Sequence, residues 1–159
     1  MTRAGIGFDS HRLTGGRRLV IGGVEIPHEL GLEGHSDADV LTHAVIDAML
    51  GAAGLGDIGE HFPDTDERWR DADSVGLLEV ALEAVLERGF TLVNVDCTVI
   101  MEAPKLAPHK TAISGRLSDA LGIGPERVNI KASTGERIGF VGRGEGVAAL
   151  AIVTLNEPG

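Results

Sequence analysis

Apolar side chains recur at helical spacing after a sequence typical of a helix start. Ser36-Asp37-Ala38-Asp39 has the Ser-x-x-Asp spacing of an N-terminal cap, and apolar residues then return every three or four positions. The pattern predicts a helix over 38–53, which the glycine-rich run 54–59 ends. The residues that follow, 61–66, are mostly polar and surround a proline, which indicates an exposed loop.

Two further amphipathic stretches predict helices over 74–88 and about 109–121. Gly89 directly follows the first of them, as is typical of a helix end, and a short helical turn is expected near Pro125. The segment 103–108 contains two prolines, so we expect a loop there.

Strand-like patterns occupy the intervals between these helices. Residues 18–26 predict a small hairpin that turns at Gly22-Gly23. Four other segments are rich in β-branched residues or partly alternate apolar and polar side chains: 3–9, 91–101, 128–133 and 146–155. The sequence therefore predicts an α/β fold of the α+β type, a two-layer sandwich. A mixed four-stranded sheet would carry helices on one face, beside a small N-terminal hairpin.

The pattern continues without a repeat or a low-complexity linker, so we expect residues 1–159 to form a single domain. A chain of this length buries about 70% of its unfolded surface and needs no disulfide. The lone Cys97 is expected in the core and fits a reducing compartment. No signal peptide or run of about 18 apolar residues is visible, so we expect a cytoplasmic protein with no membrane partner.

The chain is acidic, with 24 Asp and Glu against 14 Lys and Arg and a net charge of −10. This charge argues against non-specific nucleic-acid binding, which depends on a cationic surface. With four Phe, one Trp and no Tyr, stacking platforms for bases are also unexpected. If the protein binds phosphate, it needs local countercharge from metal ions, a few basic side chains or backbone N–H groups.

Asp9 and His11 stand two residues apart at the end of the first predicted strand, so their side chains leave the same face. His43 lies on the first predicted helix, four residues from both Asp39 and Asp47. Two histidines and one carboxylate with an open fourth position are typical of catalytic zinc, and a neighbouring carboxylate would fix the tautomer of His43. An exposed polar face without metal is the alternative, and the residues alone leave both open.

Several other residues are candidates for binding phosphate. His35 and Ser36 precede the first helix, where unpaired N–H groups favour an anion, although Ser36 could simply cap the helix. Lys105 lies in a stiff loop between prolines, where its spacing alone favours an ordinary solvated lysine over a ligand contact. Two hydroxyls and a carboxylate that suit a phosphate and a divalent cation come together after the strand 128–133: Ser133, Thr134 and Glu136. These residues favour metal-assisted phosphate chemistry, with the reaction left open.

Six blocks of the sequence follow one another in the order of a known family: Gly7-Phe-Asp-Ser-His11, His35-Ser-Asp-Ala-Asp39, Gly56-Asp-Ile-Gly59, Phe62-Pro-Asp-Thr-Asp66, Ala103-Pro-Lys105 and Gly142-Arg-Gly-Glu-Gly146. Together they resemble the 2-C-methyl-D-erythritol 2,4-cyclodiphosphate synthases of the non-mevalonate isoprenoid pathway, over essentially the whole chain. The resemblance implies a homotrimer with active sites between subunits. It also implies conversion of 4-diphosphocytidyl-2-C-methyl-D-erythritol 2-phosphate to the cyclic diphosphate, with release of CMP.

The resemblance also implies two kinds of metal site. Asp9, His11 and His43 would hold one zinc ion per subunit, whose open position takes a β-phosphate oxygen. Glu136 would bind a magnesium or manganese ion that bridges the α- and β-phosphates. These two ions would supply the positive charge that the acidic chain lacks.

Catalytic roles are implied for His35 and Thr134, which would hold the reacting phosphates in line. Residues 101–107 would bind the cytidine diphosphate half, and 57–59 with 62–66 the methylerythritol half. The full set of implied substrate contacts is Asp9, Ser10, His11, His35, Ser36, Asp57, Ile58, Gly59, Phe62, Pro63, Asp64, Thr65, Asp66, Met101, Glu102, Ala103, Pro104, Lys105, Leu106, Ala107, Ser133, Thr134, Gly135, Glu136, Phe140 and Arg143.

The chain departs from the family pattern at one position, and the resemblance also implies a cavity on the trimer axis. The family often has three threonines before its glutamate, and here the run is Ser133-Thr134-Gly135, which puts one side-chain contact in doubt. Arg143 and Glu145 could line a cavity on the trimer axis for an isoprenoid diphosphate.

Two other functions stay open: a metal-dependent phosphohydrolase that activates water, and a trimeric isoprenoid-diphosphate-binding protein with a structural metal.

Overall fold

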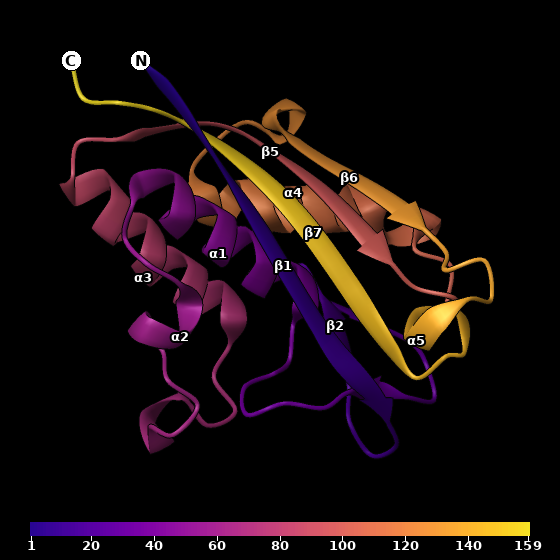
Figure 1. Ribbon diagram of the computed structural model, residues 1–159. Coiled ribbons are helices and arrows are strands. Elements are labelled where there is room, and N and C mark those ends of the chain that lie inside the picture. The colour runs from indigo at the N-terminus through magenta and orange to yellow at the C-terminus, as the bar shows by residue number, and fades with distance from the viewer.

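A five-stranded mixed sheet runs through the computed structural model, which describes residues 1–159 (Figure 1). Its strand order is β4-β1-β7-β5-β6, and only β5 and β6 pair in parallel. The strands are β1 (Thr2–Thr14), β4 (Gly31–Leu32), β5 (Thr91–Ile100), β6 (Val128–Ser133) and β7 (Gly146–Asn156). The predicted α/β sandwich with a mixed sheet is confirmed.

The sheet has one strand more than the predicted four. The extra strand, β4, has only two residues, and it pairs with the end of β1 at Leu13 and Thr14. Two residues are too few for any alternation of apolar and polar side chains, so the sequence pattern cannot reveal this strand. β1 is also longer than the predicted 3–9, because its pairing with β7 continues to Arg12.

Three long helices cover one face of the sheet (Figure 1). They are α1 (Val40–Ala53), α3 (Ser74–Glu87) and α4 (Lys110–Leu121), close to the predicted bounds. Single helical turns overlap two of the predicted loops, as α2 (Ile58–His61) and η2 (Ala107–His109). Two more single turns are η1 (Glu67–Trp69) and α5 (Gly139–Gly142). The turn expected near Pro125 is η3 (Pro125–Arg127). No helix combines the length and apolar character that crossing a bilayer requires.

The predicted hairpin is present as β2 (Leu19–Ile21) and β3 (Val24–Ile26), with both turn glycines at positive φ. Their N–H groups donate to the buried carboxylate of Asp39, at 2.8 Å from Gly22 and 2.7 Å from Gly23. The same carboxylate accepts the N–H and hydroxyl of Thr42 and so caps α1. The expected cap at Ser36 is therefore wrong, and α1 begins after Asp39.

Helix α1 lies directly on β1 because two residues of the strand have no side chain. A Cβ at Gly5 would collide with the carbonyl oxygen of Ala48, and one at Gly7 with that of Ala44. Asp9 and His11 continue the same row of β1, under the first turns of α1. The close approach of helix and strand brings His43 over these two residues.

The other face of the sheet is open and partly apolar. Ile6 on β1 pairs in register with Ile152 on β7, and these side chains are 69% and 46% exposed. Phe8, two residues along the same strand, is 55% exposed. Neighbouring large apolar side chains on one open surface are typical of a surface that another protein covers.

Candidate active site

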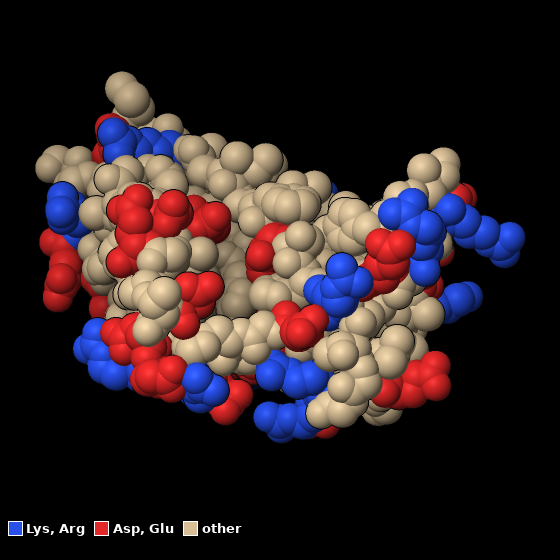
Figure 2. Space-filling model, turned by 60° about the horizontal axis from the view of Figure 1, so that its bottom comes forward, with Lys and Arg blue, Asp and Glu red and all other residues tan.

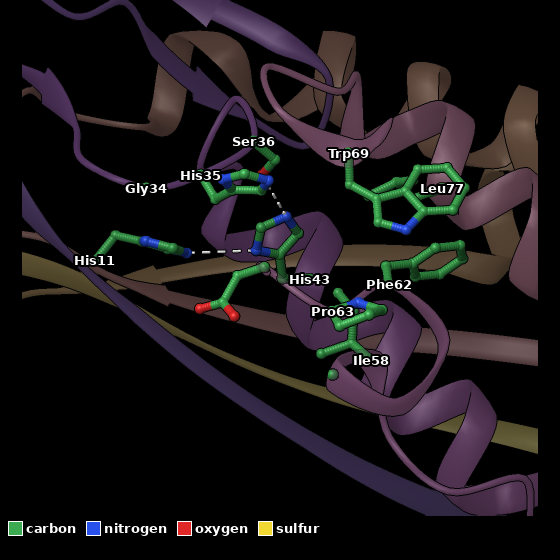
Figure 3. A pocket seen from close by; sticks show the side chains of 12 residues that line it. His11, Gly34, His35, Ser36, His43, Ile58, Phe62, Pro63, Trp69 and Leu77 are labelled. Atoms are coloured by element: carbon green, nitrogen blue, oxygen red, sulfur yellow. Dashed lines mark hydrogen bonds between the residues drawn. The ribbon is translucent and has the colours of Figure 1, made fainter. Parts of the chain in front are cut away.

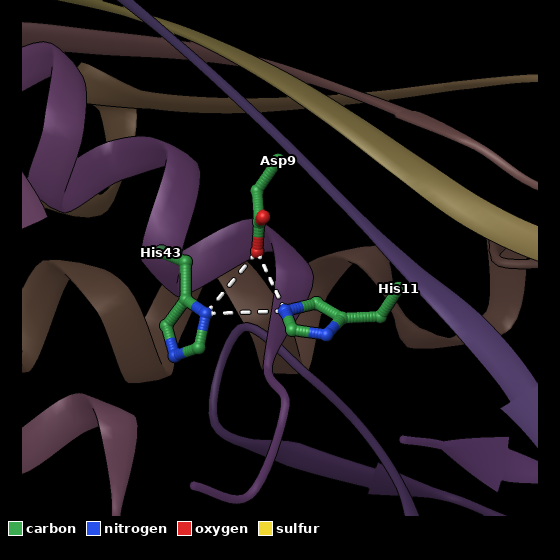
Figure 4. A group of neighbouring side chains, drawn as sticks. All are labelled: Asp9, His11 and His43. Atoms are coloured by element: carbon green, nitrogen blue, oxygen red, sulfur yellow. Dashed lines mark hydrogen bonds and ion pairs between the residues drawn. The ribbon is translucent and has the colours of Figure 1, made fainter. Parts of the chain in front are cut away.

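Three side chains from β1 and α1 meet at one point (Figure 4). Asp9 Oδ2 lies 2.8 Å from His11 Nε2 and 3.1 Å from His43 Nδ1, and the two imidazole nitrogens are 3.3 Å apart. In tetrahedral zinc sites with ligand bonds of about 2.0–2.2 Å, two ligand atoms are separated by about 3.3–3.6 Å. A small outward movement of the three atoms would therefore accept an ion, so the residues fit a zinc site.

The charges at this point favour a cation. Burial alone would raise the pKa of Asp9, but hydrogen bonds from His11 and His43 outweigh it and lower the pKa to about 2. For His11, burial lowers the pKa, while the hydrogen bond and charge of Asp9 raise it above its ordinary value. Asp9 is thus a carboxylate at neutral pH, and a cation bound beside it would compete with the proton on His11.

The second nitrogen of each histidine has its own partner. His11 Nδ1 lies 2.8 Å from the carbonyl oxygen of Glu33, so it must donate and leave Nε2 free for a metal. His43 Nε2 lies 2.7 Å from Ser74 Oγ and 3.2 Å from Ser36 Oγ. Once a metal replaces the protons shared with Asp9, both rings would therefore direct an unprotonated nitrogen toward the ion.

Neither Asp39 nor Asp47, the carboxylates expected to orient His43, makes a hydrogen bond to its ring. Asp39 caps α1 and holds the hairpin, and Asp47 accepts the N–H of Ile58. The orienting partner is instead the hydroxyl of Ser74, at the start of α3, a residue that the sequence analysis missed. His43 and Ser74 are separated by 31 positions, and no periodic pattern along that separation indicates this contact.

A pocket of about 430 Å³ opens beside the two histidines (Figure 3). It is lined by eight of the predicted substrate contacts: His11, His35, Ser36, Ile58, Gly59, Phe62, Pro63 and Asp64. Trp69 and Leu77, which the sequence analysis did not select, form part of its apolar wall. His35 Nε2 is held 3.2 Å from the carbonyl oxygen of Asp66.

Three further predicted contacts lie near this pocket without lining it. Asp57 caps α2 through the N–H of Glu60, and Asp66 pairs with Arg68 at 2.6 Å. Thr65 is exposed between Asp64 and Asp66. In the single chain, Asp57 and Asp66 therefore stabilise local turns of the pocket wall.

A separate pocket of about 380 Å³ is lined by nine further predicted contacts. It is lined by Met101, Glu102, Pro104, Lys105, Leu106, Ala107, Ser133, Thr134 and Glu136, and also by Lys110, which the sequence analysis did not select. Glu102 Oε1 accepts the N–H of Gly135 at 2.6 Å and so joins the two loops that form the pocket. The two pockets share no lining residue.

The glycine at position 135, where the family often has threonine, is explained by the close packing of its own loop. A Cβ there would lie 2.7 Å from the nitrogen of Gly142, so the absence of a side chain lets the loop around α5 approach closely. Next to it, Glu136 has a positive φ of 51°, and its N–H donates to Thr134 Oγ1 at 3.1 Å. The hydroxyl and carboxylate implied to bind phosphate and metal thus lie in one tight turn.

Ser10, Phe140 and Arg143 lie apart from both pockets. Ser10 and Phe140 line a small pocket of about 210 Å³ that also touches His11. Arg143 pairs with Glu145 at 2.7 Å on the surface. Ala103 is exposed and joins Pro104 through a cis peptide bond.

Acidic side chains surround a hollow on the face that Figure 2 shows. This view brings forward the bottom of Figure 1, where α2 and α5 lie. Asp64 belongs to the pocket beside the histidines, and the chain as a whole carries a net charge of −10. An anionic ligand at this face needs cations to offset the repulsion.

Comparisons with known proteins agree over nearly the whole chain. Residues 2–156 match the YgbB family. A 2-C-methyl-D-erythritol 2,4-cyclodiphosphate synthase from Geobacter sulfurreducens is 55% identical over 155 residues, which cover 98% of this chain and 99% of that protein. One from Halalkalibacterium halodurans is 56% identical, with the same coverage.

Solved structures show the same fold. A CDP-bound 2C-methyl-D-erythritol-2,4-cyclodiphosphate synthase has a TM-score of 0.89 at 40% identity, over 97% of this chain and 100% of that one. The bifunctional IspDF from Campylobacter jejuni has a TM-score of 0.94 at 46% identity, over 98% of this chain but 42% of that longer one. The resemblance of the six sequence blocks is confirmed, and the chain belongs to the YgbB family, the family of the 2-C-methyl-D-erythritol 2,4-cyclodiphosphate synthases.

Proposed function

We propose that this protein converts 4-diphosphocytidyl-2-C-methyl-D-erythritol 2-phosphate into 2-C-methyl-D-erythritol 2,4-cyclodiphosphate and CMP. It would act as a phosphorus–oxygen lyase in isoprenoid precursor biosynthesis. The observation that carries the proposal is the triangle of Asp9, His11 and His43 beside a pocket, in a chain 55% identical to a synthase of that name. The CDP in a similar structure supports a cytidine nucleotide as part of the substrate.

The reaction would need positioning and charge stabilisation rather than a covalent enzyme intermediate. An oxygen of the 2-phosphate forms a bond to the β-phosphorus, and the bond from that phosphorus to the oxygen of CMP breaks. CMP leaves with the electron pair, and no water is consumed. His35 in one pocket and Thr134 in the other are the residues proposed to hold the reacting phosphates in line.

The metal requirement follows from the charge of the site. A zinc ion on Asp9, His11 and His43 would withdraw electron density from the phosphorus that is attacked. Glu136, in the tight turn beside Thr134, is the proposed ligand of a magnesium or manganese ion. Lys105 and the other lining residues of the second pocket would bind the cytidine diphosphate half.

We also propose a homotrimer with its active sites between subunits. The exposed Ile6, Phe8 and Ile152 on the open face of the sheet support an interface there. The separation of the predicted contacts into two pockets supports a site that combines one pocket from each of two subunits. An isoprenoid diphosphate near Arg143 and Glu145, on the trimer axis, is part of this proposal.

Two properties of the whole chain belong to the same proposal. Residues 1–159 would act as one domain, and limited proteolysis that releases a stable smaller fragment would contradict this. The enzyme would work in the cytoplasm, which fractionation of cells that produce it would test.

Product analysis tests the proposed reaction. Incubation of the purified protein with the cytidylyl substrate, zinc and magnesium should give CMP and a cyclic diphosphate with two phosphorus signals in ³¹P NMR. Linear methylerythritol phosphates as the main product would instead indicate a phosphohydrolase. Absence of any product from the wild-type protein would favour the binding-protein alternative, in which the metal is structural. Full turnover by His43→Ala would contradict a catalytic role of the metal.

A further inference from the structure

Three side chains behind the proposed zinc site form a hydrogen-bonded chain. His43 Nε2 lies 2.7 Å from Ser74 Oγ, and Ser74 Oγ is within hydrogen-bond distance of Asp37 Oδ1. The N–H of Ser74 donates to the other carboxylate oxygen of Asp37 at 3.0 Å. Ser74 is completely buried, whereas the side chain of His43 is 12% exposed at the edge of the pocket.

The chemistry of these groups fixes the direction of each bond. Asp37 is a carboxylate that can only accept, so the single hydroxyl proton of Ser74 points to Asp37. The oxygen of Ser74 can then only accept from His43, which places the ring proton on Nε2. In the zinc-bound state, the lone pair of His43 would then lie on Nδ1, the nitrogen on the side of Asp9, whose Oδ2 is 3.1 Å away.

We propose that Ser74 and Asp37 are positioning residues that hold His43 in the tautomer and orientation that bind zinc. The inference rests on the proposed function, because it assigns a role to residues behind the zinc ligands. The charge of Asp37, acting through the Ser74 hydroxyl, would make His43 Nδ1 a stronger ligand. Neither Ser74 nor Asp37 touches the substrate pocket itself.

Backbone hydrogen bonds hold this chain of side chains in place. The N–H of Asp37 donates to the carbonyl of Ala72 at 3.1 Å, and the N–H of Asp71 donates to the carbonyl of His35 at 2.8 Å. The two segments are thereby fixed side by side, directly before the first residue of α3. These backbone bonds consequently hold Ser74, the first residue of α3, next to His43.

Ser36 is the competing partner of the same nitrogen. Its oxygen lies 3.2 Å from His43 Nε2 and also accepts the N–H of Ala38 at 3.2 Å. Both distances are longer than the 2.7 Å to Ser74, and no carboxylate accepts from Ser36. We therefore expect Ser74 to dominate the orientation of His43, with Ser36 as the weaker acceptor.

Zinc affinity, measured by competition with a chelator, tests the inference. Ser74→Ala should weaken zinc binding by about 10- to 100-fold, the range typical for loss of a partner of a metal ligand. Ser118→Ala is the matched control, because Ser118 is also buried but bonds only to the carbonyl of Gly115 in α4. That control should bind zinc as the wild type does.

A second variant and a spectroscopic measurement distinguish the loss of His43 orientation from a general loss of folding. Asp37→Asn keeps the shape but removes the charge, so it should weaken zinc binding less than Ser74→Ala while retaining a folded chain. It also decides the question if Ser74→Ala does not fold. In the zinc-bound wild type, the Nε2 proton of His43 should exchange slowly in NMR spectra, and both variants should exchange it faster.

The outcomes distinguish this inference from the proposed function. If the wild type binds zinc and both variants bind it within twofold of the wild type, Ser74 and Asp37 do not position His43 and only this inference is wrong. If the wild type binds no zinc, the proposed metal site is wrong and the inference is lost with it. Loss of zinc by Asp9→Asn, with full affinity retained in Ser118→Ala, shows that the assay reports the site.

Discussion

At the residue scale, the proposed zinc ligands differ from ordinary surface polar groups because every ring nitrogen has a defined partner. His11 donates to a backbone carbonyl and His43 to a buried hydroxyl, and both turn their other nitrogen to Asp9. An exposed polar stripe would not need this arrangement. The geometry therefore favours the metal interpretation over the exposed face that the sequence left open.

Removal of the charge of Asp9 should abolish metal binding. Asp9→Asn replaces a carboxylate by a neutral amide, which is a poor zinc ligand, so the protein should lose most of its zinc and at least about 100-fold in activity. Elemental analysis of the purified variant measures the first effect and the product assay the second. The oligomer should persist in sedimentation experiments, and a full zinc complement would contradict the ligand assignment.

Cys97 should be unreactive in the folded protein. It is completely buried on β5, and burial raises the pKa of its thiol to about 12. Since the thiolate is the reactive form, a thiol reagent at pH 8 should modify the native chain very slowly and the denatured chain rapidly. Equal rates before and after denaturation would show that the residue is not in the core.

At the element scale, the contact of α1 with β1 decides where the ligands lie. Gly5 and Gly7 let the helix rest on the strand, and this spacing places His43 above Asp9 and His11. The sequence could predict both elements from periodicity, but not their separation. That distance depends on collisions between a strand residue and a helix backbone about 40 residues later, which no local pattern contains.

Gly7→Ala should therefore disturb both stability and the site. The new Cβ would collide with backbone atoms of α1, which cannot give way as a flexible side chain can, so we expect about 1–3 kcal/mol lower stability and weaker zinc binding. Gly115→Ala in α4 is the matched control, because no atom lies within 4 Å of its added Cβ. In denaturant unfolding it should be neutral or stabilising. Equal stability of both variants would show that α1 does not rest on Gly7.

Some residues of the site could be predicted from the sequence and others could not. Asp9, His11 and His43 could be chosen because their types and spacing suit zinc and because the six blocks resemble a known family. Ser74, Asp37 and Trp69 could not, since their roles arise only when α3 and the preceding loop fold against α1. The expected partners Asp39 and Asp47 were wrong because both carboxylates satisfy backbone N–H groups instead.

At the scale of the whole molecule, the predicted contacts divide between two pockets that one chain does not unite. In the proposed homotrimer, copies of the chain would associate through the open face of the sheet, where Ile6 and Phe8 are exposed. Association and catalysis should therefore depend on each other.

A charged residue on the open face should weaken association and catalysis but leave metal binding unchanged. Ile6→Glu should produce monomers with little activity, because a buried unpaired carboxylate is costly in an interface, while the zinc complement stays close to that of the wild type. Val80→Glu is the control, since Val80 is 49% exposed on α3, in the helical layer. Sedimentation, metal analysis and turnover measure the three effects. An active Ile6→Glu monomer would refute a site between subunits.

The carboxylate of Asp39 has a consequence for how the molecule opens. It accepts N–H groups from Gly22, Gly23 and Thr42, so one side chain joins the hairpin to the first turn of α1. Neither segment can detach without leaving part of this buried carboxylate unsatisfied. The hairpin and the start of α1 should thus open as one cooperative unit, and hydrogen exchange at these three amides should proceed at closely similar free energies of opening.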